Sequence, residues 1–501
     1  MPESALPTAD PIRRVPTGVE GLDDILRGGF PQGHMYLLEG GTGKTTLGLQ
    51  FLLEGARQGE RGLFITLSST QRELEEIAHS HGWSLASLSL FELIPALERL
   101  QPEEQQSIFH PAEMEMEGQD RVVRDVVAQQ QPQRVVIDSL SELRLLTETP
   151  FLYRRQLLAW RQFFAERQCT VLLLEEYVVD SATPGVYSLI HGVLRLEQAA
   201  PEYGATRRRL QVVKLRGIAF RTGYHDYSIR RGGVIIYPRL VTGEHQQDFA
   251  KEVVSSGVAQ LDTLLGGGLT RGTSTLLTGP AGSGKSSLAL AFVFSAARRD
   301  EGAVVYSFEE GRQTLLARAA GLGMNLQEHI QAGRVRIEHV NPAELLAGEF
   351  NQRVRRAVEQ EHARVVMLDS INGLLQGLPG EKFLTVQFHE LLVFLNAQGV
   401  VTLLVLGQVG VLGDSVQEPV NLSYLADTVL LLRYFEAEGR IRQALSVVKS
   451  RGSTHERTIR ELQLGPEHIQ VGEPLTTFRG VLTGVPTYTG VEKRRSARKQ
   501  E

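Results

Sequence analysis

The sequence predicts an α/β fold in two tandem copies, each built around a mostly parallel central sheet. Three observations lead to this prediction. The chain repeats itself over most of its 501 residues. Within each copy, apolar runs of strand length alternate with amphipathic stretches of helix length, which is typical of a parallel sheet covered by helices. Each copy also has a glycine-rich loop between such a run and a helix-like stretch.

The internal repeat is clearest near the start of each copy. Residues 17–30 return as residues 256–269, and both segments share the pattern Ser/Thr-Gly-Val, Leu-Asp and a glycine pair. Further matches follow in the same order, 134–139 with 364–370 and 212–217 with 447–452. A repeat of this length indicates two homologous domains.

The domain boundaries follow from the repeat and from composition. We expect a first domain at residues 1–245, a second at 246–485, and a basic tail at 486–501 that lacks apolar periodicity and is disordered. The polar stretch 243–248 is the expected joint. A chain of 501 residues is too long for one compact core, which agrees with this division.

Composition limits the function classes. The chain carries 53 Lys and Arg residues against 58 Asp and Glu residues, a formal charge of −5, which argues against a general attraction to nucleic acid or to an acidic membrane. The N-terminal residues lack a signal-peptide pattern and no apolar run reaches the length of a membrane span, so we expect a cytoplasmic protein without membrane contact. Cys169, the only cysteine, lies in an apolar run and is expected in the core.

The second copy contains a complete phosphate-binding loop at residues 279–287. It follows the apolar run 274–278 and precedes a helix-like run, which is the context that this motif requires. Its glycines let successive backbone N–H groups point at an anion. Lys285 stands where it would reach the β- and γ-phosphates, and the Ser286 hydroxyl stands where it would hold Mg²⁺. The predicted nucleotide-binding residues here are Gly279, Gly282, Ser283, Gly284, Lys285, Ser286 and Ser287.

Acidic residues that follow two later apolar runs complete this site. Asp369 is expected to hold Mg²⁺ together with Ser286. Of Glu309 and Glu310, we expect one to be the base that deprotonates the attacking water or hydroxyl and the other to set its environment. The alternative is a solvated pair of surface acids.

Two cations near the end of the second copy predict a subunit interface. Lys449 and Arg451 stand two residues apart, so on a strand they point to the same face and together suit a phosphate. They come far downstream of Asp369, and we therefore expect them to serve the nucleotide of a neighbouring subunit, which requires a ring. Lys214 and Arg216 are their counterparts in the first copy.

The first copy departs from this pattern where chemistry takes place. Its loop is two residues shorter, so two backbone N–H groups are lost and the phosphate cradle is incomplete. Ser68 and Ser69 replace the two glutamates and cannot accept a proton at neutral pH, so hydrolysis should be poor. Nucleotide binding is weakened rather than excluded, because the lysine and threonine of the motif survive. The predicted nucleotide-binding residues of this loop are Gly41, Thr42, Gly43, Lys44, Thr45 and Thr46.

Other side chains of the first copy have expected roles of their own. Asp138 and Thr45 are its metal-binding candidates. Glu175 and Glu176 end an apolar run and offer substitute carboxylates, although this position normally senses the γ-phosphate rather than serving as a base. A lone histidine such as His225 is more often structural than catalytic.

Taken together, these motifs resemble the KaiC family of RecA-like ATPases. The opening Ser-Gly-Val-x-x-Leu-Asp pattern, the loop at 279–287, Phe308-Glu309-Glu310, Leu368-Asp369-Ser370 and the segment 449–453 occur in the family order. The resemblance covers nearly the whole chain. It implies two RecA-like P-loop domains per subunit and a homohexamer of two stacked rings. It also implies ATP and Mg²⁺ at the subunit interfaces, where Lys449 and Arg451 act on the neighbour's nucleotide.

The family resemblance also implies a candidate phosphorylation site. In this family the second domain can phosphorylate itself on an adjacent Ser-Thr pair shortly before an Asp-Thr strand start. Here Ser423 occupies the serine position, and Tyr424 replaces the threonine. Ser423 alone is therefore the phosphorylation-site candidate.

The expected function is that of an ATP-hydrolysing signalling or timing assembly, with the second domain as active ATPase and candidate autokinase. Its expected partners are copies of itself and signalling or clock proteins. Two alternatives remain open. One is a RecA-like, DNA-dependent ATPase, for which residues 207–209 form the main basic cluster. The other is a non-enzymatic scaffold whose subunits are joined by nucleotide, which the Glu309–Glu310 pair argues against.

Overall fold

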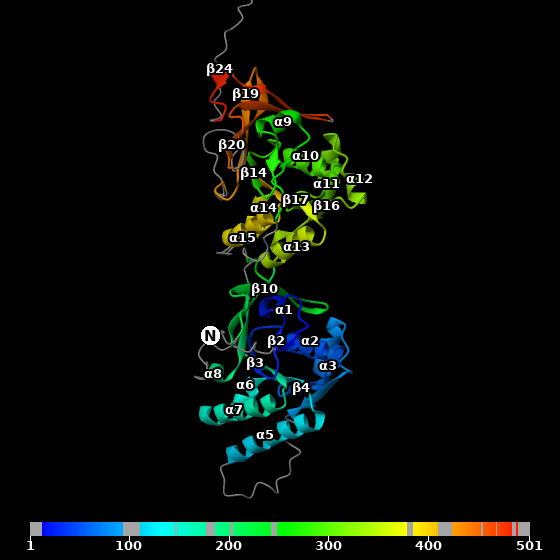
Figure 1. Ribbon diagram of the computed structural model, residues 1–501, viewed down its shortest axis with the longest axis vertical. Coiled ribbons are helices and arrows are strands. Elements are labelled where there is room, and N and C mark those ends of the chain that lie inside the picture. Colours follow the sequence, from blue (N-terminus) through cyan, green and yellow to red (C-terminus); the bar gives the residue numbers. More distant parts are fainter. Residues whose placement is uncertain are drawn as a thin grey trace, which may run out of the picture. The chain divides into compact units, whose positions relative to one another are not determined.

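The computed structural model divides the chain into two compact units, Met1–Arg239 and Leu240–Glu501, which are described separately as the first and the second domain (Figure 1). It describes residues 13–93, 111–145, 147, 149–176, 186–200, 204–241, 248–377, 384–408, 423–451, 454–466, 468–482 and 487–488. The expected joint at 243–248 lies, apart from Asp248, outside the described residues, and so does most of the expected tail at 486–501.

The first domain is built on one large sheet and a small two-stranded ribbon. Its strands are β1 (Arg14–Val15), β2 (Phe30–Pro31), β3 (Met35–Gly40), β4 (Gly62–Thr66), β5 (Leu88–Glu92), β6 (Arg134–Asp138), β7 (Thr170–Glu175), β8 (Gly192–Ala199), β9 (Arg207–Leu215), β10 (Tyr224–Arg230) and β11 (Gly233–Tyr237). The large sheet has nine strands in the order β11-β10-β9-β8-β3-β7-β6-β4-β5. Strands β8 to β5 of this order are parallel, and β9, β10 and β11 extend the sheet antiparallel.

Helices cover both faces of this sheet. They are α1 (Leu22–Leu26), α2 (Lys44–Arg57), α3 (Gln71–His81), α5 (Pro111–Gln130), α6 (Leu140–Leu145), α7 (Pro150–Glu166) and α8 (Val186–Leu189). Leu38 of β3 belongs to the buried cluster that includes Phe51 of α2. Its neighbour Leu37 belongs to the opposite cluster with Trp160 of α7. Successive strand side chains point to opposite faces, so a strand that is covered on both sides reads as the continuous apolar run seen in the sequence.

The second domain contains the counterpart elements. Its strands are β12 (Val253–Val254), β13 (Leu269–Thr270), β14 (Ser274–Gly279), β15 (Gly302–Ser307), β16 (Val335–His339), β17 (Ala363–Asp369), β18 (Val401–Gly407), β19 (Thr428–Ala437), β20 (Arg440–Ser450), β21 (Ile459–Gly465), β22 (His468–Pro474), β23 (Phe478–Arg479) and β24 (Thr487–Tyr488). Its helices are α9 (Ala259–Leu264), α10 (Lys285–Arg298), α11 (Arg312–Gly321), α12 (Leu326–Gln331), the 3-10 helix η3 (Pro342–Glu344), α13 (Ala347–Glu359), α14 (Ile371–Gly377) and α15 (Leu384–Ala397).

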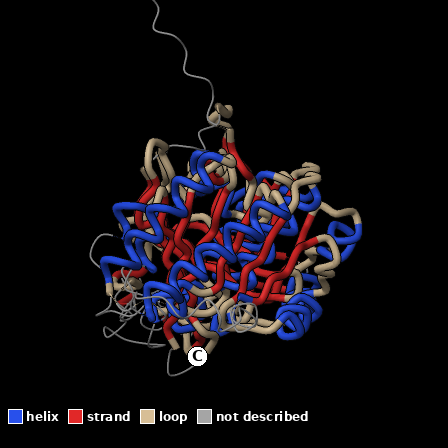
Figure 2. The backbone as a smooth tube through the Cα atoms, turned by 90° about the horizontal axis from the view of Figure 1, so that it is seen from below, coloured by secondary structure: helices blue, strands red, loops and turns tan. Residues whose placement is uncertain are grey.

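The large sheets of the two domains have the same topology. The second sheet runs in the order β16-β15-β17-β18-β14-β19-β20-β21-β22, again with parallel strands from β16 to β19 and three antiparallel strands at the other edge. Figure 2 shows strands flanked by helices, as expected for the α/β class. The predicted fold class is therefore confirmed: each domain has a nine-stranded, largely parallel sheet.

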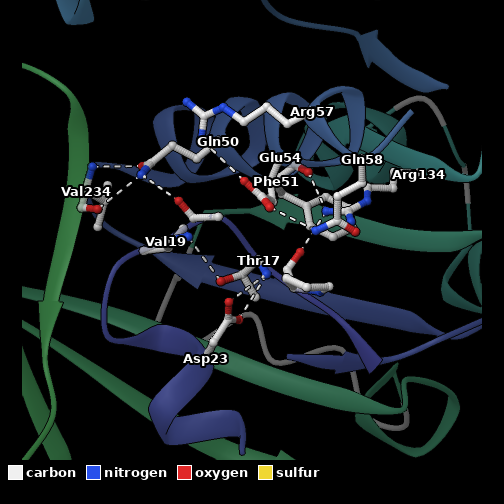
Figure 3. A network of polar contacts seen from close by, with 12 residues as sticks. Thr17, Val19, Asp23, Gln50, Phe51, Glu54, Arg57, Gln58, Arg134 and Val234 are labelled. Carbon is white, nitrogen blue, oxygen red and sulfur yellow. Dashed lines mark hydrogen bonds and ion pairs between the residues drawn. The ribbon is translucent and has the colours of Figure 1, made fainter. Parts of the chain in front are cut away.

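The repeated opening pattern forms a small hydrogen-bond network, here called the brace, which in the first domain consists of Thr17, Val19 and Asp23 (Figure 3). The carboxylate of Asp23 accepts the backbone N–H of Thr17 at 2.9 Å, and the Thr17 hydroxyl accepts the N–H of Val19 at 3.2 Å. In the second domain Asp262 accepts the N–H of Ser256 at 2.8 Å in the same way. These bonds tie the backbone before each short helix to an aspartate within the helix, which explains why the Ser/Thr and Asp positions recur.

A buried arginine fastens this brace to the sheet in the first domain only. Arg134, 1% exposed, donates to the carbonyls of Pro16 at 2.7 Å and Phe51 at 2.8 Å and pairs with Glu60 at 2.5 Å. In the second domain the strand register places the buried Val365 at this position, because Gly62 pairs with Arg134 and the matching Ala303 pairs with Val365. Arg364, the preceding residue, is exposed. An apolar side chain thus stands in the second domain where the first domain has its buried arginine.

Two further expectations concern single features. Cys169 is fully buried, and burial raises the pKa of its thiol, so it is a core residue as predicted. No helix among the described residues is both long and apolar enough to cross a membrane.

Candidate nucleotide site

Each phosphate loop connects the end of a central strand to the start of a buried helix. In the second domain the loop follows β14, and α10 begins at Lys285 after Gly284, which has φ 97°. In the first domain it follows β3, and α2 begins at Lys44 after Gly43, which has φ 105°. A left-handed residue at this point favours glycine. The first N–H groups of the helix that follows have no partners within the helix, as at every helix N-terminus. The loss of two residues thus shortens the first loop but keeps its helix N-terminus, which is the anion-binding part.

The lysines of both loops are folded back onto their own loop. Lys285 donates from Nζ to the carbonyls of Gly279 at 2.9 Å and Pro280 at 2.6 Å, and it is 7% exposed. Lys44 donates in the same way to Gly40 at 2.6 Å and Gly41 at 3.0 Å. Burial lowers the pKa of Lys285 to about 8, although the nearby charges of Asp369 and Glu309 oppose the shift. A phosphate placed in the loop would relieve this cost by supplying a stronger anionic partner.

A hydroxyl and a carboxylate meet beside each lysine. Thr45 donates from Oγ1 to Asp138 at 2.8 Å, and Ser286 donates to Asp369. Burial is the main effect that raises the pKa of both carboxyls. Oxygen donors of this kind suit Mg²⁺, which keeps several waters and takes one or two protein ligands. Among the described residues, no group of three or more His, Cys, Asp and Glu side chains is arranged so that it could hold a metal ion.

The two glutamates of the second domain have different surroundings. Both follow β15 rather than lying within it. Glu309 accepts a hydrogen bond from the Ser370 hydroxyl, next to Asp369, and its charge acts on Lys285. Glu310 forms an ion pair with Arg318 of α11, whose guanidinium also donates to Ser287 at 3.3 Å. The charges of both glutamates act on Asp369, but only that of Glu309 acts on Lys285, and Glu310 is paired with Arg318.

The first domain keeps the turn after β4 without its carboxylates. The Thr66 hydroxyl donates to the carbonyl of Ser69 at 2.7 Å, just as Ser307 donates to the carbonyl of Glu310 at 2.6 Å. Ser68 and Ser69 thus occupy the positions of the two glutamates on an unchanged backbone turn. The backbone of this turn is therefore the same in both domains, and only the side chains differ: serines stand in the first domain where the second has glutamates.

Another carboxylate lines the first-domain loop. A cavity of about 760 Å³ is bordered by residues 40–45, by residues 196–198 of β8 and by Glu176. Burial lowers the pKa of Lys44, and the nearby charges of Glu176 and Asp138 oppose the shift. Glu175, by contrast, pairs with Arg144 at 3.5 Å. The two glutamates at the end of β7 therefore have different surroundings, as expected for neighbouring residues whose side chains alternate in direction.

Three side chains that were not among the predicted nucleotide-site residues contact the first loop at Thr42. They come from adjacent antiparallel strands: Gln198 of β8 and Arg208 of β9 contact the Thr42 hydroxyl, and Tyr227 of β10 donates to its carbonyl at 2.9 Å. In the second domain Tyr434 and Gln443 donate to loop carbonyls from the matching strands. The basic run at 207–209 was visible in the sequence, but the strand pairing that brings Arg208 to the loop was not.

The cations expected at a subunit interface hydrogen-bond a short segment in each domain, residues 423–426 in the second and 187–190 in the first, here called the gripped segments. Lys449 donates to the carbonyls of Ser423 and Ala426, both at 2.7 Å, and Arg451 donates to that of Tyr424 at 3.2 Å. In the first domain Lys214 donates to the carbonyls of Tyr187 and Ile190, and Arg216 to that of Ser188. Lys449 and Lys214 lie in β20 and β9, whereas each arginine lies just beyond the strand end. Ser423 is half-buried and begins the gripped segment.

His225 is a structural residue. It is 1% exposed; its Nδ1 accepts the N–H of Arg239 at 3.0 Å, which leaves Nε2 to donate to the carbonyl of Arg221 at 3.1 Å. Burial lowers its pKa to about 4. Both nitrogens serve the backbone, as the interpretation of a lone histidine anticipated.

Comparison with known proteins agrees with this geometry. The family model described as "ATPase: KaiC" matches residues 15–241 and 254–476. The chain is 26% identical over 504 residues to the circadian clock oscillator protein KaiC of Parasynechococcus marenigrum (strain WH8102), covering 99% of this chain and 97% of that protein. It is 28% identical over 498 residues to the protein of that name from Synechococcus elongatus, covering 96% and 93%. It is 27% identical over 491 residues to the one from Thermostichus vulcanus, again covering 96% and 93%. With both domains matched, the chain belongs to the KaiC family of ATPases.

Proposed function

We propose that this protein is a ring-forming ATPase in which the second domain carries the principal catalytic site. The observation that supports this assignment is the grouping of Lys285, the Ser286–Asp369 pair and Glu309 around one complete loop. The first domain has the same lysine and hydroxyl–carboxylate pair but lacks a carboxylate after β4. Nucleotide therefore binds at both sites, and the second site turns over faster.

The reaction in the second domain follows from the positions of its side chains. The loop N–H groups and Lys285 hold the phosphates of ATP. Ser286 and Asp369 hold Mg²⁺, which supplies positive charge to the phosphate oxygens when bound. Glu309 takes the proton of the attacking water. Glu310 acts through Arg318, which orients α11 and Ser287 beside the loop.

The interface cations complete each site from the neighbouring subunit. Among the described residues, Lys449 and Arg451 donate to carbonyls of the segment 423–426, and Lys214 donates to the carbonyl of Ile190, rather than to their own phosphate loops. In a hexameric ring, the arrangement expected for this family, they would reach the adjacent subunit's nucleotide and stabilise the charge that develops there. The contacts of these cations with the neighbouring subunit would then support both ring assembly and ATP turnover.

Serine autophosphorylation is proposed for Ser423 only. Lys449 fixes this serine's carbonyl at 2.7 Å, at the segment that we assign to the subunit interface. A neighbour's ATP would therefore be the phosphoryl donor. Mass spectrometry after incubation with ATP and Mg²⁺ tests this: phosphate on Ser423 supports a timing or signalling role like that of the relatives, and an unmodified Ser423 ends it.

Two lysine variants test the division of labour. We expect Lys285→Ala to remove most ATP turnover and Lys44→Ala to remove little. Light scattering in the presence of each nucleotide measures the mass of the assembly and shows whether each variant still forms it. Loss of hydrolysis in Lys44→Ala with the assembly intact would show that the first site is the principal one. The DNA-dependent alternative has less support, because Arg209 pairs with Asp226 at 3.5 Å and Arg208 reaches Thr42.

A further inference from the structure

The carboxylate missing from one side of the first site is present on the other side. Strand β7 lies between β3, which leads into the phosphate loop, and β6, which ends at Asp138. Glu39 of β3 pairs with Glu175 of β7, so the next residue, Glu176, stands level with the start of the loop. Strand β4, which leads to Ser68, lies on the opposite side of β6.

The second domain shows that this carboxylate is specific to the first site. The N–H of Glu176 is accepted by the Ser141 hydroxyl at 3.2 Å, and the N–H of Gly407 is accepted by the side chain of Asn372 at 2.7 Å. Ser141 and Asn372 hold the same place, three residues after Asp138 and Asp369. Gly407 is thus the counterpart of Glu176. Among the described residues at these two flanks, the second site has glutamates only at the turn after β15, and the first site has them only at the end of β7.

We propose that Glu176 is the catalytic carboxylate of the first-domain site and supports its slower hydrolysis. Its carboxylate removes the proton of a water molecule while the water oxygen forms a bond to the γ-phosphorus of ATP. The bond from that phosphorus to the β–γ bridging oxygen breaks, and ADP leaves with the electron pair. The products are ADP, inorganic phosphate and a protonated Glu176, which returns the proton to solvent. This inference rests on the proposed binding of ATP at both sites.

Three features support this role for Glu176. It borders the cavity formed with the loop residues 40–45. Its charge acts on both Lys44 and Asp138, the two groups that would hold phosphate and metal. Its neighbour Glu175 is bound to Arg144 on the other side of the strand and does not compete. The hydroxyls of Ser68 and Ser69 cannot take a proton at neutral pH.

The test uses the full chain carrying Glu309→Gln, which inactivates the second site. Glutamine keeps the size of the side chain and an oxygen that can accept the hydrogen bond from Ser370. Phosphate release and the ATP-to-ADP ratio of bound nucleotide are measured together. We expect Glu309→Gln to retain slow turnover, and the added change Glu176→Gln to reduce it by about 10²-fold, in the range for loss of a general base. Bound nucleotide in the double variant should shift from ADP towards ATP. The matched control, Glu175→Gln in the same background, should change turnover by less than about threefold, because Glu175 pairs with Arg144 and does not border the loop cavity.

Other outcomes overturn the inference. Unchanged turnover after Glu176→Gln would show that another group removes the proton. Faster turnover with higher ATP occupancy would show that Glu176 repels the γ-phosphate. An absence of residual turnover in Glu309→Gln with nucleotide bound at both sites would show that the first site does not hydrolyse. An absence of bound nucleotide at either site would instead refute the proposed function itself.

Discussion

The pair Glu309 and Glu310 offers the sharpest test of the second site. The two residues are adjacent in sequence and chemically identical, but the structure surrounds them differently. Glu309 accepts from Ser370 beside Asp369, whereas Glu310 is bound to Arg318. Replacing each in turn by glutamine removes one negative charge at constant size. The comparison therefore isolates position from chemistry.

The expected effects differ by more than an order of magnitude. Loss of a general base costs on the order of 10²–10⁴-fold in rate, or about 3–5 kcal/mol of activation free energy. Glu310→Gln removes a partly solvated ion pair, since its side chain is 26% exposed and that of Arg318 is 28% exposed. Such a pair contributes about 1 kcal/mol or less, which corresponds to about a fivefold change in turnover.

The assay is steady-state phosphate release from the full chain, with light scattering and bound-nucleotide content measured on the same samples. Those two controls show that each variant still assembles and still binds ATP. We expect Glu309→Gln to lose at least about 10² of the second-site rate and Glu310→Gln to keep most of it. If Glu310→Gln loses as much as Glu309→Gln while assembly and binding persist, the assignment of the base is wrong.

Three further predictions concern stability and binding. Arg134→Ala leaves Glu60 without its buried partner and should destabilise the first domain by about 3–5 kcal/mol. Urea unfolding followed by tryptophan fluorescence measures this loss, since both tryptophans lie in that domain. The control Arg364→Ala, in the other domain, should leave this transition unchanged. Because burial lowers the pKa of His225 to about 4, below its unfolded value, its contribution to stability is present above about pH 6.5 and lost as pH falls. Between pH 7.5 and 5 the same transition should lose about 2 kcal/mol through this group, and less in His225→Gln; a loss of equal size in that variant would contradict the reasoning. Because the pKa of Lys285 is lowered to about 8 without nucleotide, ATP binding near pH 8.5 should be accompanied by proton uptake at this lysine. The calorimetric enthalpy of ATP binding should therefore depend on the ionisation enthalpy of the buffer. Equal binding enthalpies in two buffers would contradict the proton uptake.

Much of the fold was predictable because it depends on local patterns. The strand–loop–helix unit at 274–298 follows from an apolar run, a glycine-rich turn and a second apolar run, and the structure confirms it as β14, the loop and α10. The two-domain α/β architecture follows from the repeat, and the matched strand orders confirm it. The absence of glutamates at 68 and 69 was equally readable, since it is a substitution within a repeat.

The roles of individual polar residues depended on contacts between distant segments. The sequence offered Glu309 and Glu310 as a pair, and only the packing of α11, which presents Arg318, distinguishes them. Likewise the basic run at 207–209 has no visible target until β9 pairs antiparallel with β8 and brings Arg208 to Thr42.

What the sequence by itself determined is the repeat, the α/β class and the residue types at each loop, because these depend on neighbours along the chain. What only the tertiary structure decided is which carboxylate faces each phosphate loop. Glu176 and Glu175 are one residue apart, yet the pleat of β7 directs one towards the loop cavity and the other towards Arg144. A charge acts through distance in space, and that distance is set when the strands of the sheet come together.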